Sequence, residues 1–127
     1  DSSHLLAEAR MAMLLQRVRG NPAGLSAEEA LWLATRGGAR LLGRSDIGCL
    51  APGMTADIIG VRLDQLSYAG AAVHDPAAAM VFCAPMTVDL SIIDGDVVIE
   101  DGHLQTIDLG AVIAKHNTIA RSLIQSV

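Results

Sequence analysis

The stretch that decides the fold is residues 88–102, which read VDLSIIDGDVVIEDG. Apolar residues alternate with polar ones on both sides of Asp94-Gly95. Alternation with a period of two is typical of strands, and an Asp-Gly pair between two such runs indicates a two-residue hairpin with a type I′ turn. Asp101-Gly102 repeats the signal. The stretch therefore predicts antiparallel strands joined by turns at Gly95 and Gly102.

The N-terminal residues predict a first helix over 2–19. Apolar side chains recur there at helical spacing, and Ser2 or Ser3 is placed to cap the first turn. Pro22 ends the helix, because its ring cannot continue one.

A second helix is predicted from Ser26 to Leu42. Ser26 and Glu29 have the spacing of a capping box, in which each side chain accepts a hydrogen bond from the other residue's backbone amide. The helix contains Gly37-Gly38, and each glycine in a helix interior is destabilising. We expect these glycines at a place where another backbone packs closely.

From residue 47 onward the pattern changes to strands. Leu50 and residues 56–61 are strand candidates on either side of a turn at Pro52-Gly53. Asp57 could be a catalytic acid, but we interpret it as an acceptor for nearby backbone amides that fixes where the strand begins. Residues 81–83 are predicted to form a further buried strand.

A last amphipathic helix is predicted to begin near Asp108. Its apolar face carries aliphatic side chains and one histidine: Leu109, Val112, Ile113, His116, Ile119, Ala120, Leu123 and Ile124. The order helix, helix, several strands, helix predicts an α+β piece without repeats.

Composition excludes several classes of protein. With 127 residues, of which 51% are hydrophobic, the chain can build one domain with a core, which excludes disorder. A net charge of −5 with nine Lys and Arg argues against a nucleic-acid partner. No apolar run has the length of a membrane span, and no signal peptide is recognisable. Cys49 and Cys83 form no CxxC motif and are predicted to be reduced and buried in a cytoplasmic protein.

The motifs of catalytic and metal sites are missing. The four histidines are scattered singly, without HxH, HxxxH or HExxH spacing, so we predict no catalytic residue and no metal ligand in this chain. His116 is interpreted as a core or interface residue, His103 as solvent-facing, and His74 as the neighbour of an Asx-type turn. Paired carboxylates lie in caps and turns, where acids are ordinary.

Three stretches together resemble the amidohydrolase superfamily, in its metal-dependent deaminase and chlorohydrolase branch. EALWLATRGGARLLG (29–43) is similar to a late barrel helix, IGCLAPGMTADIIGV (47–61) to the return into a small β-sandwich, and VDLSIIDGDVVIEDGHL (88–104) to the closing hairpin. Residues 1–18 and 68–85 look most like 8-oxoguanine deaminases. Guanine, isoxanthopterin and hydroxyatrazine hydrolases are close alternatives.

The resemblance implies an α/β fold overall: the last helices of a (β/α)₈ barrel, the C-terminal strands of a composite β-sandwich, and a terminal helix. It also implies one divalent metal, zinc or iron, whose bound water attacks a purine-like ring and displaces ammonia. The family's histidine and glutamate motifs are absent here, so the chain is expected to be a C-terminal portion that is inactive alone. Asp1 is interpreted as following the metal aspartate. Ser2, Ser3 and His4 are expected beside the substrate, with helix capping as their alternative role.

The chain is accordingly divided into the end of the barrel (1–46), a sandwich segment (47–107) and a terminal helix (108–127). The resemblance implies a small purine-like substrate and a homo-oligomer, with no nucleic acid and no membrane as partner. The alternative from another class is a non-catalytic α+β module for interaction or oligomerisation.

Overall fold

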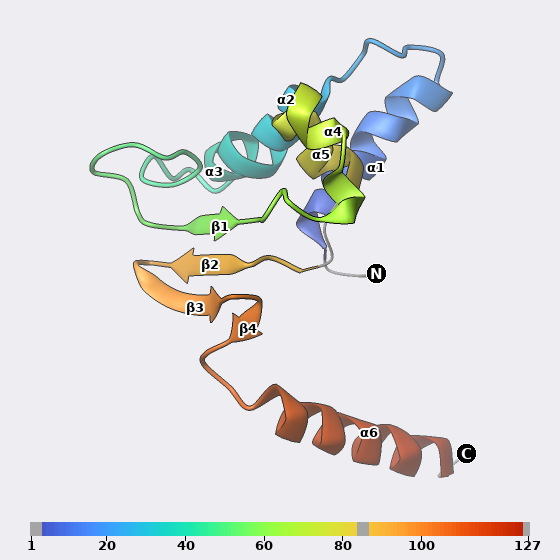
Figure 1. Ribbon diagram of the computed structural model, residues 1–127, viewed down its shortest axis with the longest axis vertical. Coiled ribbons are helices and arrows are strands. Elements are labelled where there is room, and N and C mark those ends of the chain that lie inside the picture. The colour runs from blue at the N-terminus through green and yellow to red at the C-terminus, as the bar shows by residue number, and fades with distance from the viewer. Residues whose placement is uncertain (1–3, 84–86, 126–127) are drawn as a thin grey trace.

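The chain forms a group of helices beside a small antiparallel sheet. A computed structural model describes residues 4–83 and 87–125. Helices α1 to α5 gather together, the strands β1 to β4 lie next to them, and the last helix, α6, extends away from both (Figure 1). The predicted mixture of helices with a small antiparallel sheet is therefore confirmed.

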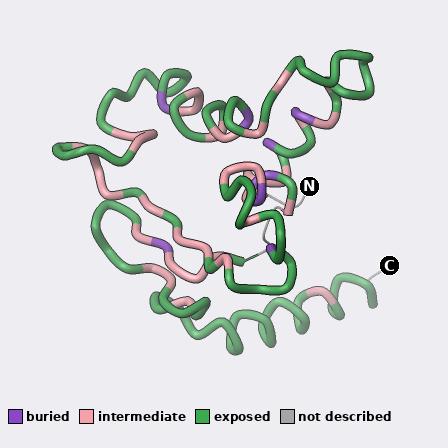
Figure 2. The backbone as a smooth tube through the Cα atoms, turned by 45° about the horizontal axis from the view of Figure 1, so that its top comes forward, coloured by how far each residue is buried: buried purple, intermediate pink, exposed green. Residues whose placement is uncertain are grey.

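The core lies where α1 (Leu5–Val18), α2 (Ala27–Trp32) and α5 (Pro76–Cys83) meet. Its buried members are small or flexible apolar side chains: Ala9, Met13, Ala30 and Val81. Half-buried apolar residues surround them, namely Leu25, Ala27, Leu31 and Ala34. Figure 2 shows that such buried positions are few and that most of the tube is exposed. The helices thus share one small core, and much apolar surface stays uncovered.

Helix α1 begins at Leu5, one residue later than it would begin if Ser3 were its cap. The cap is His4, whose Nδ1 accepts a hydrogen bond from the Ala7 amide at 3.1 Å. Ser2 and Ser3, the predicted caps, lie outside the described residues. The sequence did not predict His4 as a cap, because serine and asparagine-type side chains are the usual caps.

The second helix is confirmed at its start. Ser26 Oγ accepts from the Glu29 amide at 3.1 Å, and Glu29 Oε2 accepts from the Ser26 amide at 2.8 Å. The hydrogen bond from the Ser26 amide, followed by an interaction with the Ser26 hydroxyl, lowers the pKa of the Glu29 carboxyl, because both favour its charged form. The capping box therefore fixes the first turn of α2 as predicted.

The same helix continues past α2 through a π-helical turn, η1 (Leu33–Gly37), into α3 (Gly38–Leu41). The expectation that another backbone packs against Gly37-Gly38 is wrong. A Cβ on Gly38 would meet no atom within 4 Å, and the nearest atoms to one on Gly37 belong to Trp32 and Leu33 of the same helical run. The close approach is made instead by Gly48, which has a φ of +89°. A Cβ there would lie 2.9 Å from Ala39 Cβ, so Gly48 packs directly on the second helix.

Two of the predicted strands, at Leu50 and at residues 81–83, are absent. Residues 81–83 belong to α5, whose first turn is capped by Asp75 Oδ1 accepting from the Ala78 amide at 2.9 Å. A short buried apolar run does not distinguish strand from helix by its period, and here the cap before Pro76 favours the helix. Leu50 lies in irregular chain and is 76% exposed.

The remaining connection contains a 3₁₀ turn, η2 (Leu66–Tyr68), and a short helix, α4 (Ala71–His74). Both cysteines are half-buried rather than buried, and neither lies in a strand. The thiol of Cys83, at the end of α5, donates to the Ser67 carbonyl at 3.2 Å. The two cysteines are free, as predicted.

The sheet has the antiparallel order β1-β2-β3-β4. Its strands are β1 (Ile58–Gly60), β2 (Leu90–Ile93), β3 (Asp96–Glu100) and β4 (His103–Leu104). The two hairpins turn at Asp94-Gly95, with φ of 52° and 89°, and at Asp101-Gly102, with φ of 49° and 75°. Positive φ at both central residues is what a type I′ turn requires, so both predicted turns are confirmed.

Helix α6 (Leu109–Gln125) begins as predicted, with Asp108 Oδ1 accepting from the Ala111 amide at 3.0 Å. No residue of α6 is buried, and His116 is exposed, so its placement in a core is wrong for this chain. A contact of His116 with another chain stays a prediction. Among the described helices, none combines the length and hydropathy needed to cross a membrane.

Candidate functional site

The described residues contain no group of three or more His, Cys, Asp or Glu side chains that could hold a metal ion. His74, His103 and His116 are exposed and lie on α4, β4 and α6. The His103 ring Nδ1 lies 2.8 Å from the Asp101 carbonyl oxygen, so this side chain is engaged with its own hairpin. The described residues therefore do not fit a divalent metal on their own.

Of the three residues expected beside a substrate, the structure describes one. His4 is half-buried and caps α1 through Nδ1. Ser2 and Ser3 lie outside the described residues. The first turn of α1 is thus capped by His4, whose side chain bonds to the backbone. A role of Ser2, Ser3 or His4 toward a substrate stays a prediction.

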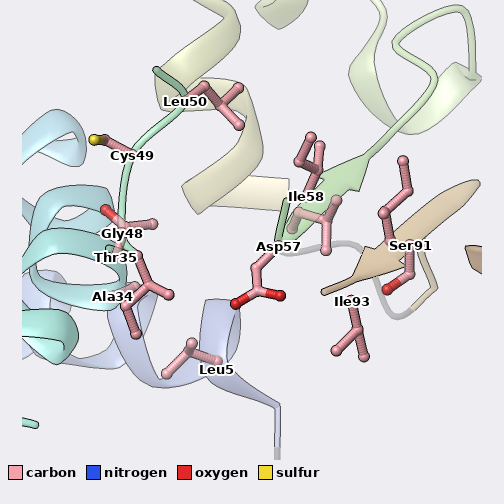
Figure 3. Close-up of a pocket in the computed structure, with 13 residues that line it drawn as sticks. Leu5, Ala34, Thr35, Gly48, Cys49, Leu50, Asp57, Ile58, Ser91 and Ile93 are labelled. Carbon is pink, nitrogen blue, oxygen red and sulfur yellow. The ribbon is translucent and has the colours of Figure 1, made fainter. Parts of the chain in front are cut away.

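A half-open pocket of about 520 Å³, here called the helix–sheet pocket, lies between the helices and the sheet. Leu5 of α1 and Thr35 of the π-helical turn form one wall, residues 47–50 form a second, and residues 57–59 and 91–93 form the sheet side. Figure 3 shows Leu5 and Thr35 on one side of the Asp57 carboxylate and Ile93 on the other, while Cys49 points away from it. The lining is mostly aliphatic, which suits the burial of apolar side chains.

Asp57 is the single carboxylate in the lining of this pocket. Its Oδ1 accepts from the Asp94 amide at 2.8 Å, and the carbonyl of neighbouring Ala56 accepts from Gly95 at 3.2 Å. The prediction that Asp57 accepts a backbone amide at the start of a strand is confirmed, but the expectation that the amide is nearby in the sequence is wrong. The amide it holds is 37 residues away, at the β2–β3 turn, which no local pattern could indicate.

The loop before β1 is fixed by charged residues that the sequence did not single out. The Arg44 guanidinium donates twice to the Asp46 carboxylate, at 2.9 Å and 2.5 Å, and Thr55 Oγ1 lies 3.3 Å from the same carboxylate. The hydrogen bonds from Arg44 lower the pKa of Asp46 to about 2. Gly53 takes the positive φ, +84°, that the predicted turn needs. These contacts shape the loop and present no reacting group.

Comparison with known proteins identifies the family of this chain. The family model described as "Amidohydrolase family" matches residues 1–98. This chain belongs to the amidohydrolase family. The resemblance inferred from the three sequence stretches is confirmed.

The amidohydrolase relatives include enzymes of known name. An 8-oxoguanine deaminase from Pseudomonas aeruginosa is 45% identical over 124 residues, which are 98% of this chain and 27% of that protein. Among solved structures, an adenosine deaminase from Xanthomonas campestris with bound zinc matches at a TM-score of 0.85 and 28% identity, covering 97% of this chain and 28% of that one. The atrazine chlorohydrolase TrzN from Arthrobacter aurescens complexed with zinc matches at 0.76 and 36% identity, covering 89% and 25%.

The chain therefore spans about a quarter of the length of the amidohydrolases that it matches. Nearly all of its own residues find a counterpart in them, so both the helical group and the sheet are parts of that larger fold. This explains why the described residues show a well-defined scaffold and no convergent set of reacting groups.

Proposed function

We propose that this chain is the C-terminal portion of an amidohydrolase that hydrolytically deaminates a purine-like heterocycle of the 8-oxoguanine type. The observation that carries the proposal is the 45% identity to an 8-oxoguanine deaminase across 98% of this chain. In the reaction, water adds to the ring carbon that bears the amino group, and ammonia leaves. One divalent metal, zinc or iron, would belong to the complete enzyme.

The chain contributes scaffold to this enzyme. Residues 1–46 would close the barrel, residues 47–107 would form part of the sandwich, and residues 108–127 would form the terminal helix. Alone, the chain would release no ammonia, because the metal ligands and the acid–base groups come from elsewhere in the enzyme. Ser2, Ser3 and His4 would lie beside the substrate, since the loops that precede barrel helices build the active-site face.

The test is a chimera of the Pseudomonas aeruginosa enzyme in which the matched segment is replaced by residues 1–127. With zinc present, we expect ammonia release from 8-oxoguanine within about tenfold of the parent rate. Guanine, isoxanthopterin and cytosine are assayed in parallel, and the parent enzyme truncated before the matched segment is the inactive control. A folded chimera that deaminates none of these substrates would overturn the proposal. Activity on a different purine-like ring would change the substrate and keep the reaction.

A second function, as a module for self-association, is favoured by α6. Six of its large apolar side chains are between 47% and 76% exposed: Leu109, Val112, Ile113, Ile119, Leu123 and Ile124. An apolar face of this kind is stable in water only when something covers it. Sedimentation of the 127-residue protein as a defined oligomer would support this function and the predicted homo-oligomer. The enzyme itself is proposed to act in the cytoplasm.

A further inference from the structure

The β3–β4 turn carries an aspartate whose side chain can react with the next backbone nitrogen. Asp101 and Gly102 are the central residues of this turn, and both are exposed. An aspartate followed by glycine is open to this reaction, because glycine has no Cβ to obstruct the approach of its nitrogen to the carboxyl carbon. The β2–β3 turn has the same pair, Asp94-Gly95, also exposed, so one molecule offers both a site and its control.

The reaction is a rearrangement that needs only water. The Gly102 nitrogen forms a bond to Cγ of the protonated Asp101 carboxyl group, and the carboxyl hydroxyl leaves as water together with the amide proton. The product is a cyclic succinimide. Water then adds to one of its carbonyl carbons, and the bond from that carbon to the ring nitrogen breaks. Cleavage at Cγ restores aspartate, whereas cleavage at the backbone carbonyl carbon gives isoaspartate, in which the main chain runs through the side-chain carbon.

His103 favours this reaction at Asp101. Its ring Nδ1 lies 2.8 Å from the Asp101 carbonyl oxygen, and since a carbonyl oxygen only accepts, Nδ1 is the donor. That carbonyl belongs to the same peptide group as the Gly102 nitrogen. When the amide loses its proton and becomes a nucleophile, its negative charge is shared with this oxygen, and a hydrogen bond to the charged form favours it. The corresponding residue after the other turn is Asp96, whose carboxylate cannot donate.

The two turns also differ in how their backbone is held. In the β2–β3 turn, both central amides donate to the residues that precede β1, at 2.8 Å and 3.2 Å. In the β3–β4 turn, the Gly102 amide donates to the Asp89 carbonyl at 3.0 Å, and it must leave this bond before it can attack. Strand β4 has two residues and lies at the end of the sheet order. Short terminal strands open at low cost, so the attacking nitrogen is released more often here.

We infer that Asp101 is a site of spontaneous isoaspartate formation, with His103 as the group that promotes it. Isoaspartate lengthens the main chain by one carbon, so a two-residue type I′ turn no longer closes the β3–β4 hairpin. Strand β4 ends at Leu104 and α6 begins at Leu109. The modification therefore releases β4 and loosens the attachment of α6 to the sheet, while β1, β2 and β3 stay paired. None of this depends on the proposed deaminase activity.

The test incubates the 127-residue protein at neutral pH, at a temperature raised but below its unfolding transition. Peptide mapping by mass spectrometry measures isoaspartate at each turn, and methyl transfer by a protein isoaspartate methyltransferase gives an independent count. We expect isoaspartate at Asp101 to accumulate about tenfold faster than at Asp94, the effect of one hydrogen bond to a charged group. Amide hydrogen exchange in the aged protein should be faster in β4 and unchanged in β1 and β2.

Two variants separate the two causes. His103→Phe keeps an aromatic ring on β4 and removes the donor, so isoaspartate at Asp101 should form about tenfold more slowly. His103→Leu, which also lacks a donor, should give the same result if the phenylalanine disturbs the turn. Asp57→Ala removes the acceptor of the Asp94 amide and should raise isoaspartate at Asp94 about fivefold, with no change at Asp101.

Equal rates at the two turns of the unaltered protein, or a faster rate at Asp94, would overturn the inference. An unchanged rate at Asp101 in both His103 variants would refute the role of the imidazole. Aged protein that contains isoaspartate at Asp101 but exchanges its β4 amides as slowly as fresh protein would refute the release of β4.

Discussion

Asp57 Oδ1 accepts a hydrogen bond from the backbone amide of Asp94 at 2.8 Å. The carbonyl of Ala56 accepts from Gly95 at 3.2 Å, so both central residues of the β2–β3 turn are held by the residues that precede β1. The residues just before β1 and the β2–β3 hairpin are thereby fixed to each other. One exposed carboxylate thus supports their alignment, together with the Ala56 carbonyl and the pairing of β1 with β2.

Replacing this carboxylate should therefore loosen the hairpin turn. We expect Asp57→Ala to lower the free energy of unfolding by about 1 kcal/mol, because the Asp94 amide loses its partner. Asp57→Asn keeps an acceptor oxygen and should cost less. Urea unfolding followed by circular dichroism measures both. Asp96→Ala, which removes a nearby exposed carboxylate, is the control, and an equal loss in that variant would refute the role given to Asp57.

Gly48 should be far less tolerant of a side chain than Gly53, although both have positive φ. The φ values are +89° and +84°. A Cβ on Gly48 would lie 2.9 Å from Ala39 Cβ and 3.1 Å from both Arg36 Cα and the Thr35 carbonyl oxygen, whereas a Cβ on Gly53 would meet no atom within 4 Å. We expect Gly53→Ala to cost about 1 kcal/mol from backbone strain alone. Gly48→Ala should cost about 2 kcal/mol more, because the helix must move.

The difference in the free energy of unfolding between these two variants separates the cost of backbone strain from the cost of the steric clash. Thermal unfolding of the two proteins under the same conditions gives the comparison directly. Equal losses would mean that residues 47–50 do not pack against the second helix in solution.

Local patterns predicted the parts of this fold that are decided within a few residues. The Ser26–Glu29 box and the Asp-Gly turns depend on neighbours in sequence, so spacing and residue type were sufficient. The prediction of a strand at residues 81–83 was wrong because a short apolar run fits either a strand or a helix. Here Asp75, which caps the first turn of α5, favours the helix.

The site was less predictable, because its contacts join distant segments. The Asp57–Asp94 bond spans 37 residues, and the pocket brings together Leu5, Leu50 and Ile93. The close approach of Gly48 to Ala39 was assigned to the wrong glycines, since a glycine in the sequence does not show which backbone it faces. The roles of Ser2, Ser3 and His4 toward a substrate remain predictions for the same reason.

Asp46 should titrate at an unusually low pH. Hydrogen bonds from the Arg44 guanidinium lower its pKa from 3.8 to about 2. Because the folded-state pKa is depressed, this pairing stabilises the fold above about pH 4, and the contribution is lost as the pH falls from there toward 2. Carboxyl NMR titration should report a pKa near 2, and Arg44→Gln should return it toward 3.8. An unchanged pKa in Arg44→Gln would show that the pair is not formed in solution.

Tyr68 should tolerate the loss of its hydroxyl but not of its ring. The side chain is 1% exposed, and among the described residues its hydroxyl has no hydrogen-bond partner, while burial raises its pKa. We expect Tyr68→Phe to leave the free energy of unfolding unchanged or to raise it by up to about 1 kcal/mol, since an unpaired polar group leaves the interior. Tyr68→Ala should lower it by about 3 kcal/mol or more, because the ring leaves a cavity. Equilibrium unfolding in urea distinguishes the two effects, and a clear destabilisation by Tyr68→Phe would mean that the hydroxyl is hydrogen-bonded in solution.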